Sequence, residues 1–146
     1  MLVYRTRDAG PQVLLAHMGG PLWSRKDEHA WTIPKGEYTA DEDPLAAARR
    51  EFAEELGSPP PDGAWLELGE VRQSGGKTVT AWAVEGEFDP ETAVSNTFEL
   101  EWPPRSGRLQ SFPEIDRVAW FDVDTARAKL IAAQVAFLDR LVDAMA

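Results

Sequence analysis

Three glutamates lie close together in one stretch of the sequence, at Glu51, Glu54 and Glu55. Residues three and four positions apart are neighbours on an α-helix, so this spacing gathers three carboxylates on one patch. Like charges at these spacings repel one another, and no Lys stands between them. Such a charge run is most often only a solvated face. A divalent cation would remove the repulsion, because hard cations prefer oxygen ligands.

The helix that would position these carboxylates is predicted over residues 44–56. Asp43 can accept a hydrogen bond from a free N–H group of the first turn, and Pro44 suits the first helical position. Gly57 supplies the end of the helix. Apolar residues, among them Phe52, fall on a different side from the glutamates. The helix can therefore pack against a core while its carboxylates converge outside it.

The other segments predict a β-sheet that holds this helix. Short apolar and β-branched runs bounded by Gly, Pro, Asn or Asp are typical of strands. They occur at residues 1–5 and 12–17, which form an opening hairpin, and at 29–33, 65–72, 78–84, 98–102 and 117–121. One or two closing helices are predicted from Asp124, which caps them with Thr125, to Met145. This order favours an α/β fold, with a mixed sheet between helices, in a single domain of residues 1–146.

Composition narrows the possible chemistry. The 146 residues include no Cys, which excludes disulfides, thiolate zinc sites and a Cys nucleophile. A formal net charge of −10 argues against a broad surface for nucleic-acid backbones. No apolar run approaches the roughly 20 residues that span a bilayer, and the first residues lack the pattern of a signal peptide. We therefore expect a soluble, cytoplasmic protein.

A longer pattern surrounds the glutamates and resembles the signature of the Nudix hydrolase superfamily. The matching residues are Gly36, Glu42, Arg50, Glu51, Phe52, Glu54, Glu55 and Gly57, with Pro34-Lys35-Gly36-Glu37 as a frequent lead-in. Ser58 departs from the pattern, which expects an aliphatic residue there, and this weakens a packing contact without touching the carboxylates. The resemblance implies an α/β/α sandwich that hydrolyses a nucleoside diphosphate linked to another group X.

The resemblance also implies a metal centre and assigns roles to its residues. A pyrophosphate can approach several carboxylates only through a cation such as Mg²⁺ or Mn²⁺. By the pattern of the family, Glu54 and Glu55 are the principal ligands, together with the Gly36 carbonyl. Glu51 is a ligand or the base that positions the attacking water, and Arg50 orients Glu51. The signature does not assign the general base, which varies within the superfamily.

A further acidic ligand is expected from a loop that precedes a late strand. Glu114 follows Phe112-Pro113 and precedes the strand that ends in Trp120-Phe121, which makes it the best candidate. Glu99 and Glu101 compete with it.

Candidate substrate-binding residues lie in the loops that flank the signature. Lys26 and Lys35 could contact phosphates as point charges, and Arg105 or Arg108 could reach distal phosphates. Each is more simply a solvated cation. Trp23, in an irregular segment, could stack on a base. The candidate substrate-binding set is Lys26, Lys35, Trp23, Glu99 and Arg105.

Other aromatic residues and both histidines are expected to be structural. Trp102 could also stack on a base, whereas Trp31 and Trp120 are expected to anchor the core. His17 and His29 have no second His at a ligand spacing, so structural or surface roles are expected for them.

Two alternatives to an enzyme remain at this point: a Nudix-fold module that senses a nucleotide without turning it over, and a structural acidic domain. The Trp-x-x-Pro-Lys-Gly run at 31–36 resembles both dinucleoside polyphosphate hydrolases and enzymes that remove oxidised nucleoside triphosphates. We expect a small nucleotide-type substrate, no membrane, no stable nucleic-acid partner, and a monomer or homodimer.

Overall fold

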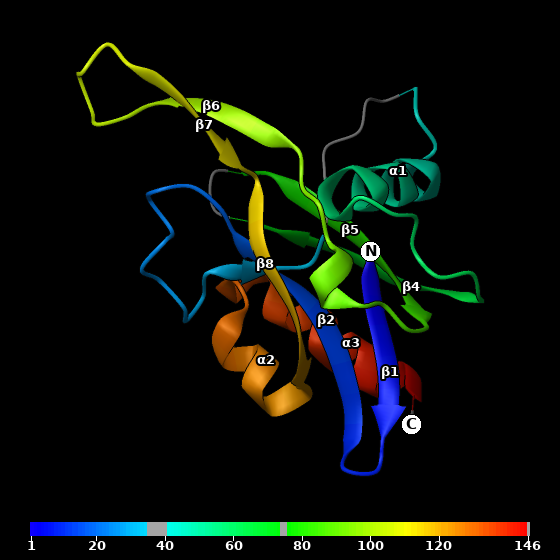
Figure 1. The fold of residues 1–146 in the computed structure, drawn as a ribbon. Coiled ribbons are helices and arrows are strands. Elements are labelled where there is room, and N and C mark those ends of the chain that lie inside the picture. Colours follow the sequence, from blue (N-terminus) through cyan, green and yellow to red (C-terminus); the bar gives the residue numbers. More distant parts are fainter. Residues whose placement is uncertain (35–40, 74–75, 146) are drawn as a thin grey trace.

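The structure is a computed structural model that describes residues 1–34, 41–73 and 76–145 (Figure 1). Its strands are β1 (Leu2–Arg7), β2 (Gly10–Met18), β3 (Trp31–Thr32), β4 (Trp65–Arg72), β5 (Thr78–Glu85), β6 (Thr97–Glu101), β7 (Leu109–Pro113) and β8 (Ile115–Asp122). Its helices are α1 (Pro44–Leu56), α2 (Val123–Lys129) and α3 (Val135–Met145), with short 3₁₀ turns η1 (Pro90–Thr92) and η2 (Ala132–Gln134). None of these described helices is both long and apolar enough to cross a membrane.

The main sheet contains parallel and antiparallel neighbours. β1 pairs antiparallel with β2 and parallel with β5, and β5 continues antiparallel to β4. β8 and β3 both pair antiparallel with β2. The predicted mixed sheet is therefore confirmed.

The two faces of this sheet are covered by different helices. Side chains alternate along a strand, so successive residues enter different cores. In β1, Val3 joins the cluster that contains Phe52 of α1, whereas Leu2 joins the cluster that contains Phe137 of α3. Figure 1 shows α1 on one side of the sheet and α2 and α3 on the other. The predicted α/β/α sandwich is confirmed.

A two-stranded arm extends from the body of the molecule (Figure 1). It consists of β6 and β7, which pair antiparallel with Phe98 opposite Phe112. The sequence analysis predicted β6 approximately but missed β7, because the run Leu-Gln-Ser-Phe-Pro at 109–113 has no apolar alternation and ends in Pro. Its extended conformation depends on pairing with β6 rather than on local preference.

Several predicted boundaries differ from the structure by one or two residues, and the contacts of the chain explain two of these differences. The strand expected at 29–33 contains only Trp31–Thr32, because His29 adopts a φ of 56° and the Ala30 N–H bonds back to Asp27. The cap of the first closing helix is Asp122, which accepts a hydrogen bond from the Thr125 N–H at 2.8 Å; Asp124 lies inside α2. Extended backbone at Leu130 then separates α2 from the segment that leads into α3.

Candidate active site

Helix α1 presents its acidic residues from a firmly capped position. The Asp43 carboxylate accepts a hydrogen bond from the Ala46 N–H at 3.1 Å, and Gly57 ends the helix in the left-handed region at a φ of 79°. Phe52 and Leu56 are fully buried against the sheet. The predicted helix is confirmed in both boundaries, and the burial of its apolar side leaves the glutamates on the remaining surface.

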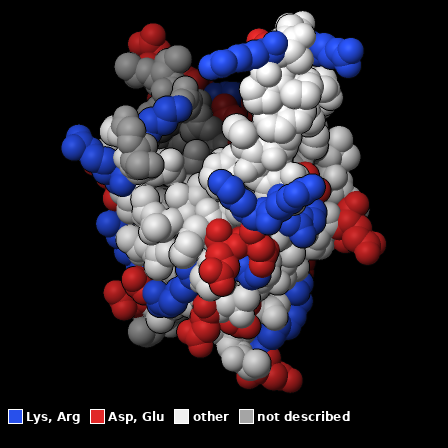
Figure 2. Space-filling model, turned by 90° about the vertical axis from the view of Figure 1, so that its left-hand side faces the viewer, with Lys and Arg blue, Asp and Glu red and all other residues white. Residues whose placement is uncertain are grey.

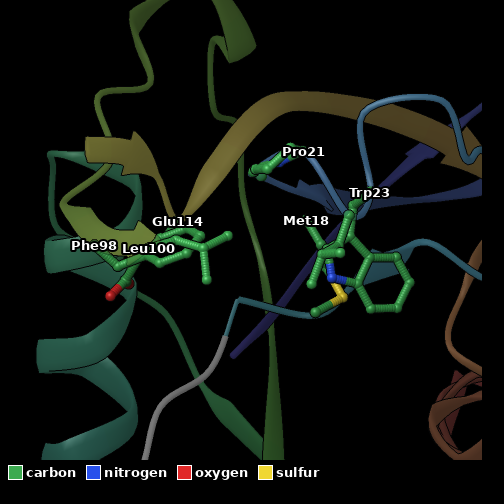
Figure 3. Close-up of a pocket in the computed structure, with 9 residues that line it drawn as sticks. Met18, Pro21, Trp23, Phe98, Leu100 and Glu114 are labelled. Carbon is green, nitrogen blue, oxygen red and sulfur yellow. The ribbon is translucent and has the colours of Figure 1, made fainter. Parts of the chain in front are cut away.

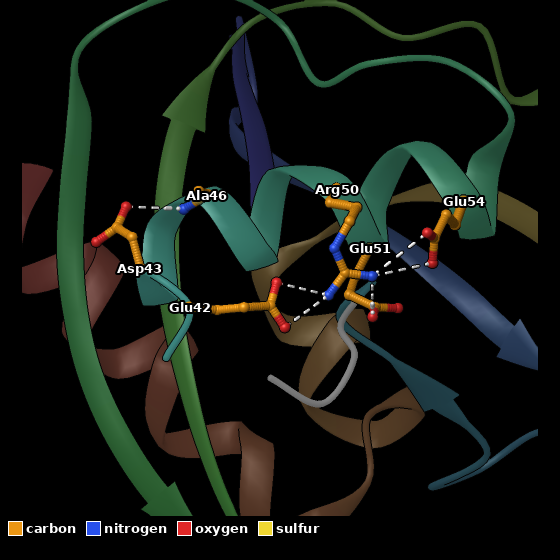
Figure 4. Close-up of polar contacts among 6 residues, drawn as sticks. All are labelled: Glu42, Asp43, Ala46, Arg50, Glu51 and Glu54. Atoms are coloured by element: carbon orange, nitrogen blue, oxygen red, sulfur yellow. Dashed lines mark hydrogen bonds and ion pairs between the residues drawn. The ribbon is translucent and has the colours of Figure 1, made fainter. Parts of the chain in front are cut away.

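Arg50 joins three carboxylates at the surface of α1 (Figure 4). Its Nη1 donates to Glu51 Oε1 at 2.9 Å and to Glu54 Oε1 at 3.3 Å. Its Nη2 donates to Glu42 Oε2 at 3.0 Å, from the segment before the helix. The repulsion expected among the glutamates is thus offset by a residue of the helix itself, because the planar guanidinium presents several donors in a fork.

The environment of Glu51 differs from that of its neighbour. The Glu51 side chain is 17% exposed, compared with 43% for Glu54. Burial raises the pKa of the Glu51 carboxyl above its ordinary value; the Arg50 charge opposes this rise, while the negative charges of Glu54 and Glu114 add to it. A carboxyl with a raised pKa is better suited to accept a proton than a fully solvated one.

Glu114 reaches this region from a distant part of the sequence. It lies between β7 and β8, where its N–H donates to Asn96 O at 2.8 Å and its carbonyl accepts from Gly19 N at 2.8 Å. These backbone bonds fix the residue between two other segments. Its charge contributes to the raised pKa of Glu51, so each of these two carboxylates lies within the electrostatic range of the other. Glu99 and Glu101, the competing candidates, lie on β6 instead.

Glu55 lines a small cavity of about 70 Å³. Ser95, Asp116 and Arg117 also line this cavity. Glu55 is partly buried, whereas Glu54 is exposed. The two adjacent glutamates of α1 therefore have different surroundings.

The carboxylate donors of this region suit a hard divalent cation. Glu51, Glu54 and Glu114 supply carboxylate oxygens, and the effect of like charge on Glu51 favours a cation nearby. Among the described residues, however, no group of three or more Asp, Glu or His side chains is arranged to hold a metal ion. Gly36, predicted to contribute a carbonyl, lies outside the described residues.

An apolar pocket of about 220 Å³ lies next to Glu114 (Figure 3). One wall comes from the end of β2 and the segment that follows it. The other comes from the apolar face of β6. The principal lining residues are Met18, Leu22, Trp23, Phe98, Leu100 and Glu114. Glu114 lies at the end of the pocket nearer α1, and Trp23 and Met18 lie at the other end (Figure 3). In Figure 2 this face of the molecule is hollowed beside the arm.

The predicted substrate-binding residues occupy different places around this pocket. Trp23 lines it, and Lys26 holds its ammonium 5.1 Å from the centre of the Trp23 ring. Glu99 alternates with Phe98 and Leu100 along β6 and does not line the pocket. Arg105 belongs to the loop between β6 and β7, and Figure 1 shows this loop away from α1. Lys35 lies outside the described residues.

Four of the principal lining residues were not identified from the sequence: Met18, Leu22, Phe98 and Leu100. The alternation of Phe98 and Leu100 with exposed residues in β6 indicates one apolar face, but not what that face borders. Which segment lies opposite depends on the backbone contact between Gly19 and Glu114, which joins positions far apart in the chain.

His17 fixes one end of the segment that leads into the pocket. It is fully buried, with Nδ1 2.7 Å from Asp116 Oδ1 and Nε2 2.6 Å from Lys26 O. Both ring nitrogens are therefore used in contacts within the protein. His29 Nδ1 contacts Leu130 O at 2.8 Å. These contacts agree with the structural roles expected for both histidines.

Most of the chain matches one protein family. A family model described as NUDIX domain matches residues 1–141. No curated protein matches the sequence.

Several solved structures share the fold. A binary complex of a C. elegans Ap4A hydrolase is 19% identical over 99% of this chain and 93% of that chain, with a TM-score of 0.62. The NUDIX domain of Shewanella oneidensis NrtR complexed with ADP ribose is 15% identical over 99% and 84%, with a TM-score of 0.64. A MutT protein from Methanosarcina mazei Go1 is 19% identical over 99% and 91%, with a TM-score of 0.57. At these identities the likeness concerns the fold.

Proposed function

Because the chain belongs to the NUDIX domain family, we propose that it hydrolyses a pyrophosphate bond in a nucleoside diphosphate linked to another group, with the help of a divalent cation. The observation that carries the proposal is the approach of carboxylates from two distant segments. Glu51 and Glu54 come from α1, and Glu114 comes from the junction of β7 and β8, yet the charge of Glu114 acts on Glu51.

The proposed reaction is an attack of water at phosphorus. A new P–O bond forms to the water oxygen, and the bond from phosphorus to the bridging oxygen breaks. One proton of the water passes to a carboxylate of α1, and the bridging oxygen leaves with the other phosphoryl group. Glu51, Glu54 and Glu55 are the candidate bases, and Arg50 holds Glu51 and Glu54 in place through its two-sided contacts.

Glu51, Glu54, Glu55 and Glu114, together with the Gly36 carbonyl, would hold Mg²⁺ or Mn²⁺. Such an ion, when bound, neutralises the negative charge that develops on the phosphoryl oxygens. Carboxylates alone would repel a pyrophosphate. The cation is therefore needed for binding of the substrate as well as for the rate of hydrolysis.

Cationic side chains beside the pocket are proposed to contact the phosphate chain. Lys26 lies against Trp23 and is exposed, so its ammonium is available to an anion at the mouth of the pocket. Lys35 and Arg105 complete the proposed set, with Glu99 as a polar residue on the neighbouring arm. As point charges, lysines suit phosphate oxygens without demanding one geometry.

The test is a panel of nucleotides incubated with Mg²⁺ or Mn²⁺, with analysis of the phosphate-containing products. The panel includes Ap4A and ADP ribose, because similar structures are of an Ap4A hydrolase and of a NUDIX domain complexed with ADP ribose, and it also includes ordinary and oxidised nucleoside triphosphates. Glu54→Gln and Glu55→Gln should each lower the rate by about 10²-fold or more, because removal of a ligand or base affects the chemical step.

Glu67→Gln is the matched control, since it neutralises an exposed glutamate on β4. It should retain the rate of the wild type. Hydrolysis that needs no metal, or full activity in both α1 variants, would contradict the mechanism. Tight binding of one nucleotide without hydrolysis of any would favour a nucleotide-sensing module instead.

A further inference from the structure

Residues 94–96 connect the two parts of the chain that carry the carboxylates of the proposed metal centre. The Val94 N–H donates to the carbonyl of Leu56, the last residue of α1, at 3.0 Å. Two residues later, the Asn96 carbonyl accepts a hydrogen bond from the Glu114 N–H at 2.8 Å. In Figure 1 the segment that leads into β6 passes between α1 and β8. The gap between α1 and Glu114 is therefore spanned by a short segment that carries no proposed ligand.

The Ser95 side chain is hydrogen-bonded on both sides in the middle of this segment. Its hydroxyl oxygen accepts a hydrogen bond from the N–H of Ile115, the residue after Glu114, at 3.0 Å. Its O–H donates to the Asn96 carbonyl at 2.8 Å, and the same carbonyl receives the Glu114 N–H. A hydroxyl group can donate one bond and accept others at once. Ser95 therefore acts on Ile115 directly and on Glu114 through the Asn96 carbonyl.

Both ends of this connection lie against fixed parts of the molecule. A Cβ atom on Gly57, at the end of α1, would lie 2.9 Å from Val94 O and 3.0 Å from Val94 Cβ. On the other side, Ile115 is buried in the cluster that contains Phe52 of α1. A shift of residues 94–96 relative to the helix would meet these contacts, so the segment can transmit the position of α1 to Glu114.

The position of Glu114 decides whether its carboxylate can share an ion with Glu51. Oxygen ligands lie at about 2.0–2.1 Å from Mg²⁺, and a binding group must be held to within about 0.5 Å of its productive position. Glu114 is exposed and lies at the junction of β7 and β8. Little packing surrounds an exposed side chain, so its position depends on how firmly its backbone is held.

We propose that Ser95 is a positioning residue for the metal centre. Its hydroxyl holds the backbone of Glu114 and Ile115 against residues 94–96, and this keeps the Glu114 carboxylate within reach of an ion bound by α1. The inference rests on the proposed function for the presence of that ion. Ser95 itself is not proposed to contact the ion or the substrate.

The experiment is a titration of the protein with Mn²⁺ in the absence of nucleotide, with free Mn²⁺ measured by electron paramagnetic resonance. Ser95→Ala should raise the Kd for Mn²⁺ about tenfold or more, as for other residues that orient metal ligands. Ser95→Thr keeps the hydroxyl group and should restore the affinity of the wild type. The cavity of about 70 Å³ that Ser95 lines leaves room for the additional methyl group.

Circular dichroism melts show whether Ser95→Ala is folded at the temperature of the titration. If it is not, Ser95→Cys replaces it, because a thiol of similar size is a weaker hydrogen-bond partner than a hydroxyl. The Kd of Ser95→Cys should then rise in the same direction by a smaller factor.

A double-mutant cycle identifies the residue through which Ser95 acts. In a Glu114→Gln background, Ser95→Ala should cause little further loss of affinity, because the ligand that Ser95 positions is already altered. In a Glu54→Gln background the loss should be as large as in the wild type, since Glu54 belongs to α1. A general structural role would lower the affinity by the same factor in both backgrounds.

Ser106→Ala is the matched control. The Ser106 hydroxyl also accepts a backbone hydrogen bond, from the Arg108 N–H at 3.2 Å, but in the loop of the arm that lies away from α1 (Figure 1). This variant should leave the Kd for Mn²⁺ unchanged.

Three results would overturn the inference and leave the proposed hydrolysis intact: an unchanged Kd in Ser95→Ala, no recovery in Ser95→Thr, or an equal loss in the two backgrounds of the cycle. Binding of Mn²⁺ that depends on Ser95, without hydrolysis of any nucleotide, would support the inference and contradict the proposed function. If the wild type binds no Mn²⁺, the inference is overturned.

Discussion

At the scale of single residues, Arg50 has the widest set of contacts around the proposed site. Its guanidinium contacts Glu42, Glu51 and Glu54 at the same time. Glu51 and Glu54 are also proposed to bind a divalent cation. Their carboxylates would then contact two positive charges, the guanidinium of Arg50 and the bound ion. The negative charges around it raise the pKa of Arg50, chiefly through the hydrogen bond to Glu42, which keeps this residue charged under all ordinary conditions.

Arg50→Lys tests whether the forked geometry matters as well as the charge. Lysine offers one compact ammonium and cannot hold Glu42 and Glu54 together. We expect kcat to fall about tenfold or more, as for other residues that orient metal ligands, and the melting temperature to change little. Arg49→Lys, next in sequence and stacked near Trp65, should retain kcat. A fall in kcat equal in both variants would show that position 50 has no special role.

Asp27 links the segment after β2 to α2 and provides a prediction on pH. It contacts Lys129 and accepts a hydrogen bond from Trp31 Nε1 at 3.0 Å. The hydrogen bond from Lys129, followed by that from Trp31, lowers the pKa of the Asp27 carboxyl below its ordinary value of 3.8. Folding therefore favours the ionised form, so the contribution of Asp27 to stability is present above pH 3.8 and is lost as the pH falls through the lowered folded-state pKa.

Asp27→Asn should reduce stability at neutral pH and have a smaller effect in acid. The difference in melting temperature between wild type and variant should narrow as the pH falls below 3.8, the ordinary pKa of the group. Thermal melts from about pH 2 to pH 7, which extend below the ordinary pKa, measure this. Asp62→Asn, an exposed residue before β4, serves as the control and should show no such trend. A constant difference for Asp27→Asn across the range would contradict the assignment.

At the scale of elements, structure that depends on local sequence signals was predicted more accurately than structure that depends on long-range strand pairing. Helix α1 was predicted to the residue because Asp43, Pro44 and Gly57 are local signals that act through the backbone of their own turn. β7 was not predicted and β3 was predicted too long, since the extended conformation of these strands depends on their partners β6 and β2. Glu114 was found as a candidate by the family pattern, yet its position depends on Asn96 and Gly19.

Gly57→Ala tests the end of α1. Gly57 has a φ of 79°, and a Cβ there would lie 2.9 Å from Val94 O, a backbone atom that cannot easily move. We expect a loss of about 1 kcal/mol or more in the free energy of unfolding, because alanine is strained at positive φ. Gly76 has a similar φ of 82°, and no atom of the described residues lies within 4 Å of a Cβ placed there, so Gly76→Ala measures the strain alone. Denaturant titrations of both variants give the two values; a larger loss for Gly76→Ala would contradict the contact.

At the scale of the whole molecule, Gln134 connects the helical layer to the sheet beside the signature segment. It is fully buried, and its Oε1 accepts from the Ile33 N–H at 2.9 Å while its Nε2 donates to Gln73 Oε1 at 2.8 Å. Thr32 contributes a further bond through its hydroxyl group. No local sequence signal predicts this role. Gln134 stands between Ala133 and Val135 near the C-terminal helix, where a glutamine is ordinarily expected at the surface.

Gln134→Leu should lower the free energy of unfolding by about 1–3 kcal/mol, because it leaves the buried Ile33 N–H without its acceptor. Gln110→Leu, on the exposed arm, should change it by less. Chemical denaturation monitored by tryptophan fluorescence measures both variants. Equal stability of Gln134→Leu and the wild type would show that another group or a water molecule satisfies Ile33.

The parallel pairing of β1 with β5 has a consequence for the order in which the molecule assembles. Residues Leu2 to Tyr4 pair with Ala83 to Glu85, so the opening hairpin cannot join the β4–β5 part of the sheet until β5 has been synthesised. Met1, Val3 and Val84 also belong to the cluster that receives Phe52 and Leu56 of α1. During synthesis on the ribosome, helix α1 is therefore made before the cluster that it packs against is complete. It can dock only after β1 and β5, which are far apart in the sequence, have paired. Such pairing is slow relative to helix formation.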